Sequence, residues 1–280
     1  LDYHNITPPE WFAGWEPAVA YGLAWGRAQL RALAPRAGFG LADSAYNAAE
    51  LARAGQRRTA VLPILLPDDE VPPDAARVAE LKEVAGARWV FVGRLAPNKR
   101  QHLLIAALHA YRRAYDPMAH LDLVGGASSP SYARALRAFA RDLGLAAAVT
   151  FTGAVPDDER NARYAAADVF VCLSAHEGFL VPLVEAWRHD VPVVAYTGAP
   201  AVAETMGDAG VAVPEATAPA AAAAVARVLH DPALAAELRR RGAARAACFG
   251  PERTRARLLE LAQGLADGLA DRPGLAGLRR

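Results

Sequence analysis

From residue 88 onward, short runs of apolar residues alternate with segments in which apolar residues recur every three or four positions. The segment 101–115 shows the second pattern, with Leu104, Leu108 and Tyr111 on one helical face. The short runs predict strands at 89–92, 120–124, 149–152, 168–173, 191–196 and 210–213. Strands that are apolar throughout are typical of a parallel sheet covered on both faces, so we predict an α/β fold with a Rossmann-like, doubly wound parallel sheet.

The first 67 residues contain much less strand pattern. Their apolar spacing predicts helices at 17–34 and 44–54, with Ser44 as the N-cap of the second helix, and one short strand at 61–66. One strand does not close an independent α/β domain, so we interpret this region as an incomplete N-terminal α/β domain. The chain also begins at Leu1 rather than Met, and we therefore expect a fragment or a processed product.

The resulting domain organisation has four parts. An acidic, proline-containing stretch after residue 67 has the composition of a linker, and alanine-rich helical patterns follow the last predicted strand. We predict a partial N-terminal domain at 1–67, a linker at 68–87, a C-terminal domain at 88–250, and a C-terminal helix and tail at 251–280.

Charge and rare residue types narrow the function classes. The 31 basic and 30 acidic residues give a net charge of +1, which removes the electrostatic case for a dedicated nucleic-acid binder. The two cysteines, Cys172 and Cys248, are too few for a disulfide framework or a Cys-rich zinc site, which fits a cytoplasmic protein. The seven histidines have no metal-ligand spacing, and the sequence lacks the glycine-rich motifs of dinucleotide and P-loop proteins. We expect neither a metal nor a bound cofactor.

Two basic residues follow the first strand of the predicted sheet. Arg94 comes directly after Gly93, which ends the strand, and Lys99 is one of only two lysines in the chain. The carboxyl ends of parallel strands form the ligand-binding edge of such sheets, so both cations can reach an anion there. The alternative is a pair of solvated surface cations; the position at the sheet edge favours an anion site, and a diphosphate would suit two cations.

The loop after the fourth strand opens on the same edge and carries two carboxylates. Pro182 suits the first turn of a helix, which leaves the amides of the preceding residues, Gly178 to Val181, available to an anion. Glu177 and Glu185 would be about 12 Å apart along a continuous helix, beyond the roughly 5–9.5 Å of a glycosidase pair. We therefore expect two different roles; for Glu185 the alternative is to complement the helix dipole.

These residues together carry a resemblance. Gly93-Arg94, Lys99 and the E-x7-E pair of Glu177 and Glu185 resemble the family-4 (group 1) retaining glycosyltransferases, which have the GT-B fold. The similarity runs from residue 1 to about 265. Supporting pieces are Tyr3 to Pro8, 123–126, 151–153, 167–170 and 198–205, the last of which contains Glu204.

The resemblance implies an enzyme that moves a sugar from a nucleoside-diphosphate sugar to a sugar, lipid or other hydroxyl acceptor. It further implies that the anomeric configuration is retained and that no metal takes part. Arg94 and Lys99, next to Gly93, match the pair that binds the diphosphate of the donor and stabilises its departure. Glu185 matches the carboxylate that holds the ribose hydroxyls of the donor.

The resemblance also assigns the residues around the transferred sugar. Glu177 matches the first glutamate of the motif, which lies against that sugar. The main-chain amides offered to sugar hydroxyls and phosphate are those of Gly178, Phe179, Leu180 and Val181. His4 matches an active-site histidine contributed across the cleft by the N-terminal domain; a buried or capping histidine is the alternative.

The sequence departs from the family pattern in four respects. Leu180 stands where glycine is common, Val181 where leucine is common, and Ala203 where proline is common. Because leucine has less backbone freedom than glycine, we expect the sugar-facing loop to be shaped for a different donor. The family also has two complete Rossmann-like domains, so we expect this chain alone to bind a nucleotide-sugar and to transfer poorly.

Other interpretations stay open. Trp11, Phe12 and Trp15 are interpreted as core residues, and the alternatives are an acceptor cleft or peripheral contact with a membrane. The same GT-B site would also serve phosphorolysis, nucleotide-sugar hydrolysis or epimerisation. A nucleotide-sugar-binding module without catalysis is the second alternative.

Overall fold

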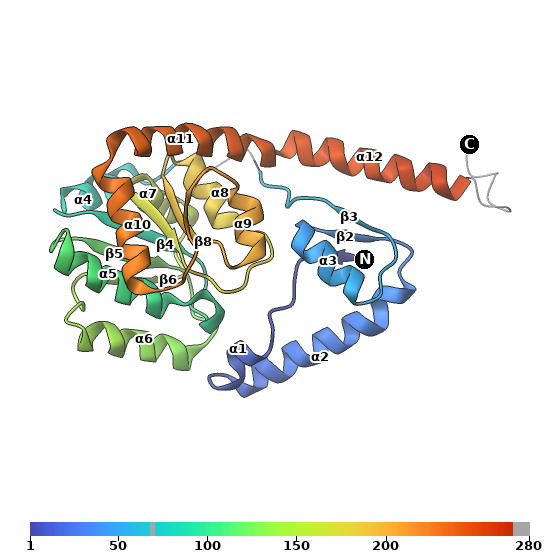
Figure 1. The fold of residues 1–280 in the computed structure, drawn as a ribbon, viewed down its shortest axis with the longest axis horizontal. Helices are drawn as coiled ribbons and strands as arrows, with labels where there is room; N and C mark the ends of the chain where they lie inside the picture. Colours follow the sequence, from blue (N-terminus) through green and yellow to red (C-terminus); the bar gives the residue numbers. More distant parts are fainter. Residues whose placement is uncertain (68–70, 271–280) are drawn as a thin grey trace.

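The computed structural model describes residues 1–67 and 71–270, with side chains described to residue 267. Within these residues two separate parallel sheets form, one of three strands and one of six (Figure 1). The small sheet belongs to the N-terminal part and the large sheet to the C-terminal part, so the predicted α/β fold with a Rossmann-like sheet is confirmed.

The strands are β1 (Asp2–Tyr3), β2 (Gly40–Ala42), β3 (Thr59–Val61), β4 (Arg88–Val92), β5 (His120–Val124), β6 (Val149–Gly153), β7 (Val169–Cys172), β8 (Val193–Tyr196) and β9 (Val211–Val213). The helices are α1 (Glu10–Ala13), α2 (Pro17–Leu33), α3 (Ala45–Arg53), α4 (Ala75–Glu83), α5 (Gln101–Ala114), α6 (Pro130–Asp142), α7 (Asp157–Ala165), α8 (Val181–Arg188), α9 (Pro200–Met206), α10 (Ala218–His230), α11 (Pro232–Ala246) and α12 (Pro251–Ala270). Short 3-10 turns at 34–36, 97–99 and 247–249 complete the described structure.

The large sheet has the strand order β6-β5-β4-β7-β8-β9, with all neighbours parallel. From β4 the chain adds β5 and then β6 on one side of the sheet. It then returns to the other side of β4 and adds β7, β8 and β9 in turn. In sheets of this kind ligands bind beyond the carboxyl ends of the two central strands, where the winding direction reverses. Here that position lies between β4 and β7.

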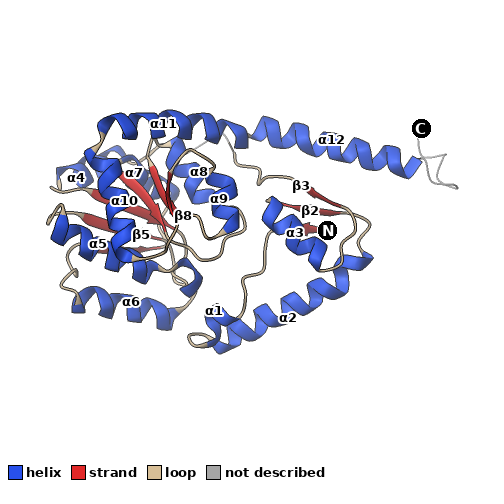
Figure 2. Ribbon diagram, in the orientation of Figure 1, coloured by secondary structure: helices blue, strands red, loops and turns tan. Residues whose placement is uncertain are grey.

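Helices cover both faces of the large sheet (Figure 2). Helix α10 packs against α5, α4 packs against α7, and α11 packs against α8. One continuous core lies between these layers and the sheet; its largest fully buried side chains include Trp89, Tyr111 and Tyr164. The six strands predicted for this region are confirmed to within two residues at each end.

The N-terminal part contains more strand than its sequence predicts. Strands β1, β2 and β3 form a parallel sheet, and the sequence prediction had neither β1 nor β2. The strand predicted at 61–66 is wrong, because the observed strand β3 ends at Val61. Pro63 has no amide hydrogen to continue the ladder, which explains the early end.

Both helices predicted for this region are present in the structure. The helix predicted at 17–34 is confirmed as α2, and the helix at 44–54 is confirmed as α3. Ser44 caps α3 as predicted, because its hydroxyl oxygen accepts a hydrogen bond from the amide of Asn47 at 3.2 Å. The segment 68–87, predicted to be a linker, contains helix α4.

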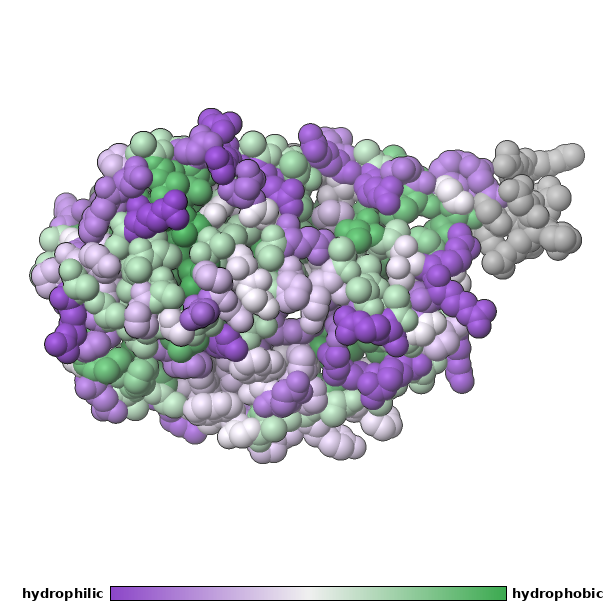
Figure 3. Space-filling model, viewed as in Figure 1, coloured by the Kyte–Doolittle hydropathy of each residue, from purple (hydrophilic) through white to green (hydrophobic). Residues whose placement is uncertain are grey.

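The surface in the view of Figure 1 carries hydrophilic side chains over both parts of the molecule, interspersed with apolar patches (Figure 3). Helix α12 extends away from the C-terminal part toward the side on which the small sheet lies (Figure 1). Among the described residues, no helix combines the length and the apolar character that crossing a bilayer requires. The predicted tail beyond residue 270 lies outside the described residues.

The packing of the large core gives a stability prediction. Ile105 on α5 has no exposed surface, so its replacement by alanine leaves a cavity, and we expect the free energy of unfolding to fall by about 2–5 kcal/mol. Leu259 on α12 is 70% exposed, and Leu259→Ala should change stability by less than about 0.5 kcal/mol. Urea denaturation of both variants measures the difference; equal losses would contradict the assigned core.

Candidate functional site

The loops that follow β4 and β7 are tied together by Asn98. The amide of Ala175 donates to the main-chain oxygen of Asn98 at 2.8 Å. The side-chain nitrogen of Asn98 donates to the main-chain oxygen of His176 at 3.2 Å. Asn98 is only 4% exposed, so it fixes the two loops side by side at the point where the winding of the sheet reverses.

Lys99 and Glu177, one from each loop, form an ion pair. The Nζ atom of Lys99 lies 2.5 Å from Oε2 of Glu177, and the side chains are 18% and 7% exposed. The second carboxylate oxygen, Oε1 of Glu177, is buried and has no hydrogen-bond partner among the described residues. A buried carboxylate oxygen without a partner is costly, so this atom is a ready acceptor for a hydroxyl or amide of a ligand.

The negative charge of Glu177 also affects Cys172 at the end of β7. Burial, and secondarily the charge of Glu177, raises the pKa of the Cys172 thiol to about 11. The thiol is therefore protonated at neutral pH, and its sulfur lies 3.3 Å from Oγ of Ser174. Cys172 is fully buried, so the prediction of a small core residue is confirmed.

Arg94 lies at the same edge of the sheet but differs from Lys99 in its surroundings. Its main-chain oxygen accepts a hydrogen bond from Nε2 of Gln101 at 2.9 Å, whereas its guanidinium is exposed and has no partner among the described residues. Gly93 and Gly125, which end β4 and β5, both have positive φ. A Cβ atom on Gly125 would lie 2.4 Å from the main-chain oxygen of Gly93, so glycine is required for the close approach.

Helix α8 begins directly after the Glu177 loop. Val181 is its first residue, Pro182 lies in its first turn as predicted, and Leu180 is the residue before the helix. Leu180 has φ 76° and ψ 63°, a left-handed conformation that glycine adopts without strain and leucine does not. Phe179 is held in place by the Thr205 hydroxyl, which donates to its main-chain oxygen at 2.5 Å.

Glu185 lies apart from the ion pair, within a separate cluster. The Tyr164 hydroxyl donates to Oε2 of Glu185 at 3.0 Å. The same hydroxyl also lies 3.0 Å from the main-chain oxygen of Pro182. Arg160 lies 3.9 Å from the other carboxylate oxygen. Burial, and secondarily the charge of Glu185, raises the pKa of Tyr164, so its hydroxyl remains a donor. The two glutamates of the E-x7-E pair therefore have different partners, as the spacing argument expects.

The N-terminal segment reaches this site through Gly178. A Cβ atom on Gly178 would lie 3.0 Å from both the main-chain oxygen of His4 and Nδ2 of Asn47. The His4 imidazole points to carboxylates of its own domain: Nε2 lies 3.0 Å from Asp2, and Nδ1 lies 3.8 Å from Asp43. The structure thus brings the main chain of His4, not its ring, against the Glu177 loop.

A second contact between the two parts of the chain is made by Glu204 of α9. Its two carboxylate oxygens accept hydrogen bonds from the amides of Ala45 and Tyr46 at 2.7 and 3.2 Å. These amides belong to the first turn of α3 and have no partner within the helix. The sequence singled out Glu204 only as part of a family-like segment. Its role as a cap was missed, because Glu204 lies 159 positions from the amide of Ala45 and leaves no local signal near α3.

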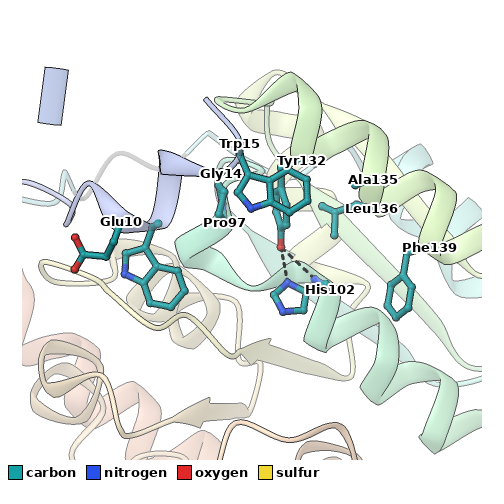
Figure 4. Close-up of a pocket in the computed structure, with 10 residues that line it drawn as sticks. Glu10, Gly14, Trp15, Pro97, His102, Tyr132, Ala135, Leu136 and Phe139 are labelled. Atoms are coloured by element: carbon teal, nitrogen blue, oxygen red, sulfur yellow. Dashed lines mark hydrogen bonds between the residues drawn. The ribbon is translucent and has the colours of Figure 1, made fainter. Parts of the chain in front are cut away.

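A pocket of about 510 Å³ lies beside the Lys99 loop, between α1, α5 and α6 (Figure 4). Aromatic rings form much of its wall, and the Tyr132 hydroxyl points to the His102 ring at 2.9 Å. Its lining residues are Glu10, Trp11, Gly14, Trp15, Pro97, His102, Tyr132, Ala135, Leu136 and Phe139. Of the three aromatic residues interpreted as core, Phe12 is buried, whereas Trp11 and Trp15 line this pocket.

Among residues 1–67 and 71–270, no group of three histidine, cysteine or carboxylate side chains is arranged to hold a metal ion.

The close approach at Gly178 gives a testable prediction. In Gly178→Ala the new methyl group presses on His4 and Asn47, so we expect the free energy of unfolding to fall by about 1–3 kcal/mol. Gly250→Ala is the control, because the nearest atom lies 3.6 Å from the added carbon and the backbone has negative φ. Thermal unfolding of both variants checks this; no loss specific to Gly178→Ala would show that the N-terminal segment does not pack on the loop.

Comparison with solved structures supports the fold. Anabaena HepE in complex with UDP-glucose superposes with a TM-score of 0.78 at 24% identity, over 94% of this chain and 71% of that chain. Sucrose-phosphate synthase from Thermosynechococcus elongatus superposes with a TM-score of 0.76 at 26% identity, over 95% and 67%. These likenesses identify the GT-B arrangement.

Curated relatives share more sequence. A GDP-mannose-dependent alpha-(1-6)-phosphatidylinositol monomannoside mannosyltransferase from Mycobacterium tuberculosis is 40% identical over 145 residues, 48% of this chain and 37% of that protein. The enzyme of the same name from Mycolicibacterium smegmatis is 36% identical over 219 residues, 72% and 56%. A D-inositol 3-phosphate glycosyltransferase from Acidothermus cellulolyticus is 34% identical over 189 residues, 64% and 41%. The chain thus spans 37–56% of the length of these relatives.

The family profile covers the part of the chain that carries the site. It matches residues 75–245, which include β4 through α10, the ion pair and the E-x7-E loop. Together with the superposed folds, this match shows that the chain belongs to the glycosyl transferases group 1 family.

Proposed function

We propose that this protein is a retaining, family-4 type glycosyltransferase that moves a hexose from a nucleoside-diphosphate sugar to a hydroxyl acceptor without a metal. The observation that carries the proposal is the Lys99–Glu177 ion pair with its unpartnered carboxylate oxygen, placed where the sheet winding reverses. A sugar hydroxyl would complete the hydrogen bonding of Glu177, and a phosphate would lie on the other side of the lysine.

Lys99 has the donors that such a role needs. An ammonium group has three N–H donors, and one of them is directed at Glu177, which leaves two for phosphate oxygens. Arg94 adds an exposed guanidinium from the same loop. In the first turn of α8, Pro182 has no amide hydrogen and the amide of Leu183 donates to the main-chain oxygen of Leu180 at 3.1 Å. The amide of Val181, at the start of the helix, is left to favour an anion. In the proposed function these three groups together stabilise the departing diphosphate.

The proposed transfer needs no reactant besides the donor and the acceptor. The bond between the anomeric carbon and the diphosphate oxygen breaks, and the electron pair leaves with the diphosphate. The acceptor oxygen forms the new bond to the anomeric carbon, and its proton passes to the leaving diphosphate. Lys99 and Arg94 stabilise the charge that develops on the diphosphate, which is the largest catalytic contribution in this scheme.

The remaining residues fit the rest of the donor. Glu185, held by Tyr164, would accept hydrogen bonds from two ribose hydroxyls. His4 would act across the interface, which needs its ring to turn away from Asp2. The pocket of Figure 4 borders the Lys99 loop through Pro97, and its aromatic walls suit a sugar ring or the apolar part of a lipid acceptor.

The relatives narrow the substrates to test. Two of them are named for GDP-mannose as donor and a phosphatidylinositol mannoside as acceptor, and others for D-inositol 3-phosphate. HepE is solved with UDP-glucose. We therefore take GDP-mannose and UDP-hexoses as the first donors, and inositol-containing hydroxyl compounds as the first acceptors.

Product analysis with these donors tests the proposal. Transfer of the sugar to the acceptor with an unchanged anomeric configuration, in the presence of EDTA, is the expected result. Release of free sugar would instead indicate hydrolysis, and formation of a sugar phosphate would indicate phosphorolysis. Binding of the nucleotide-sugar without any product would leave the non-catalytic module as the function.

Removal of either cation should weaken donor binding. Each charge-assisted hydrogen bond contributes about 1.5–3 kcal/mol, so Arg94→Ala and Lys99→Ala should lower kcat/KM for the donor by roughly 10- to 150-fold. Lys82→Ala is the matched control, because Lys82 is the other lysine, is exposed, and lies in α4. Steady-state kinetics measures the effect, and unchanged values in both site variants would refute the diphosphate assignment.

Glu185→Gln should act on the nucleotide. The substitution keeps the shape and the Tyr164 contact but removes the charge that favours ribose hydroxyls, so we expect the Kd for the free nucleoside diphosphate to rise about tenfold. The preference among different sugars on one nucleotide should stay within about twofold. Calorimetry and competition kinetics measure the two effects, and the reverse pattern would exchange the roles of Glu185 and Glu177.

A further inference from the structure

We infer that Asn5 and Asn47 are positioning residues that fix the Glu177 loop from the N-terminal part of the chain, through a hydrogen-bonded relay that ends on Asp43. The inference rests on the proposed function for its kinetic test, but its geometry does not depend on it.

The relay consists of three short hydrogen bonds in sequence. Nε2 of His176 lies 2.6 Å from Oδ1 of Asn5. Nδ2 of Asn5 donates to Oδ1 of Asn47 at 2.7 Å, and Nδ2 of Asn47 donates to Oδ1 of Asp43 at 2.6 Å. Asn47 has no exposed surface, Asp43 and His176 are 3% and 7% exposed, and Asn5 is half-buried. The Asn47–Asp43 bond is therefore shielded from water, and the two bonds of Asn5 are partly shielded.

The carboxylate at the end of the relay sets the direction of every bond in it. Asp43 accepts only, so the nitrogen of the Asn47 amide faces it and the Asn47 oxygen faces Asn5. The Asn5 nitrogen therefore faces Asn47, and the Asn5 oxygen faces His176. An oxygen acceptor at this position requires that Nε2 of His176 carries the proton. Burial lowers the pKa of His176, which agrees with a neutral ring.

Two backbone features show that the relay is built at a cost. Asn5 has φ 90°, a left-handed conformation that residues other than glycine adopt only rarely. A side chain at Gly178 would crowd the relay, because an added Cβ would lie 3.0 Å from Nδ2 of Asn47 and 3.1 Å from Cβ of Asn5. Asn5 and Gly178 thus lie against each other where the two parts of the chain meet.

The relay acts on Glu177 through the residue before it. The main-chain oxygen of His176 accepts from Asn98, and the ring of His176 is held by Asn5. Glu177 is therefore anchored from the Lys99 loop on one side and from the N-terminal segment on the other. Loss of the relay should leave Lys99, Arg94 and Glu185 in place for the nucleotide, while the sugar-facing Glu177 and Gly178 become misplaced.

The tautomer of His176 tests the relay without any assay of activity. In the protein labelled with ¹⁵N-histidine, long-range ¹H–¹⁵N NMR should show a neutral ring protonated at Nε2, assigned by its disappearance in His176→Gln. In Asn5→Gly, which suits the positive φ and removes the amide, the single tautomer should be replaced by a mixture. A ring protonated at Nδ1 in the wild type, or an unchanged Nε2 tautomer in Asn5→Gly, would overturn the inference.

Kinetics tests the consequence for Glu177. Asn5→Gly and Asn47→Ala should each lower kcat at least fivefold, and up to about a hundredfold, since small misplacements of reacting groups have such effects. The Kd for the free nucleoside diphosphate should change by less than threefold. The double variant should be no slower than the slower single variant, because both substitutions break one relay.

Gln56→Ala is the matched control. Gln56 is a buried amide of the same N-terminal part, and it bonds to the main-chain oxygens of Ala34 and Ala37, away from the loop. It should lower the melting temperature and leave kcat within twofold. Losses of kcat below fivefold in both relay variants, or fully multiplicative losses in the double variant, would overturn the inference. If the wild type transfers no sugar, the proposed function fails, and the tautomer measurement still decides the relay.

Discussion

The ion pair between Lys99 and Glu177 is the contact on which the candidate site depends. It joins the loops that follow the two central strands of the large sheet, and it holds a carboxylate at 7% exposure with one oxygen unpartnered among the described residues. A buried charge of this kind is stable only beside its counter-ion. The same pairing leaves the lysine with free N–H donors and the glutamate with a free acceptor oxygen, which in the proposed function would bind a phosphate and a sugar hydroxyl.

The N-terminal part of the chain makes direct contacts with this site. Glu204 caps α3 from the other domain, and Gly178 permits the main chain of His4 and the Asn47 amide to contact the loop. The main-chain groups in these contacts cost free energy if they are buried without a hydrogen-bond partner. The arrangement of the Glu177 loop is therefore a property of both parts together, as the proposed donor site requires.

Whether a feature could be predicted from the sequence depended on how far apart along the chain the interacting residues lie. The strands of the large sheet and the capped helix α3 were predictable, because apolar periodicity and capping are local patterns. Strands β1 and β2 were not, since two or three residues carry no periodicity and are defined only by pairing with each other. The left-handed conformation of Leu180 was not predictable either, because Leu180 is buried and the surrounding packing outweighs the local cost.

The sequence by itself determined the alternating α/β pattern, the edge of the sheet at which the candidate site lies, and the two loops whose residues resemble group 1 glycosyltransferases. Only the tertiary structure decided that Lys99 pairs with Glu177 while Glu185 pairs with Tyr164, and that Asn5, Asn47 and His176 form one relay. The physical reason is that these contacts join residues 21 to 171 positions apart. A local pattern specifies which backbone conformation a segment adopts, but the partner of a buried polar group is specified by which segments the packed core brings together.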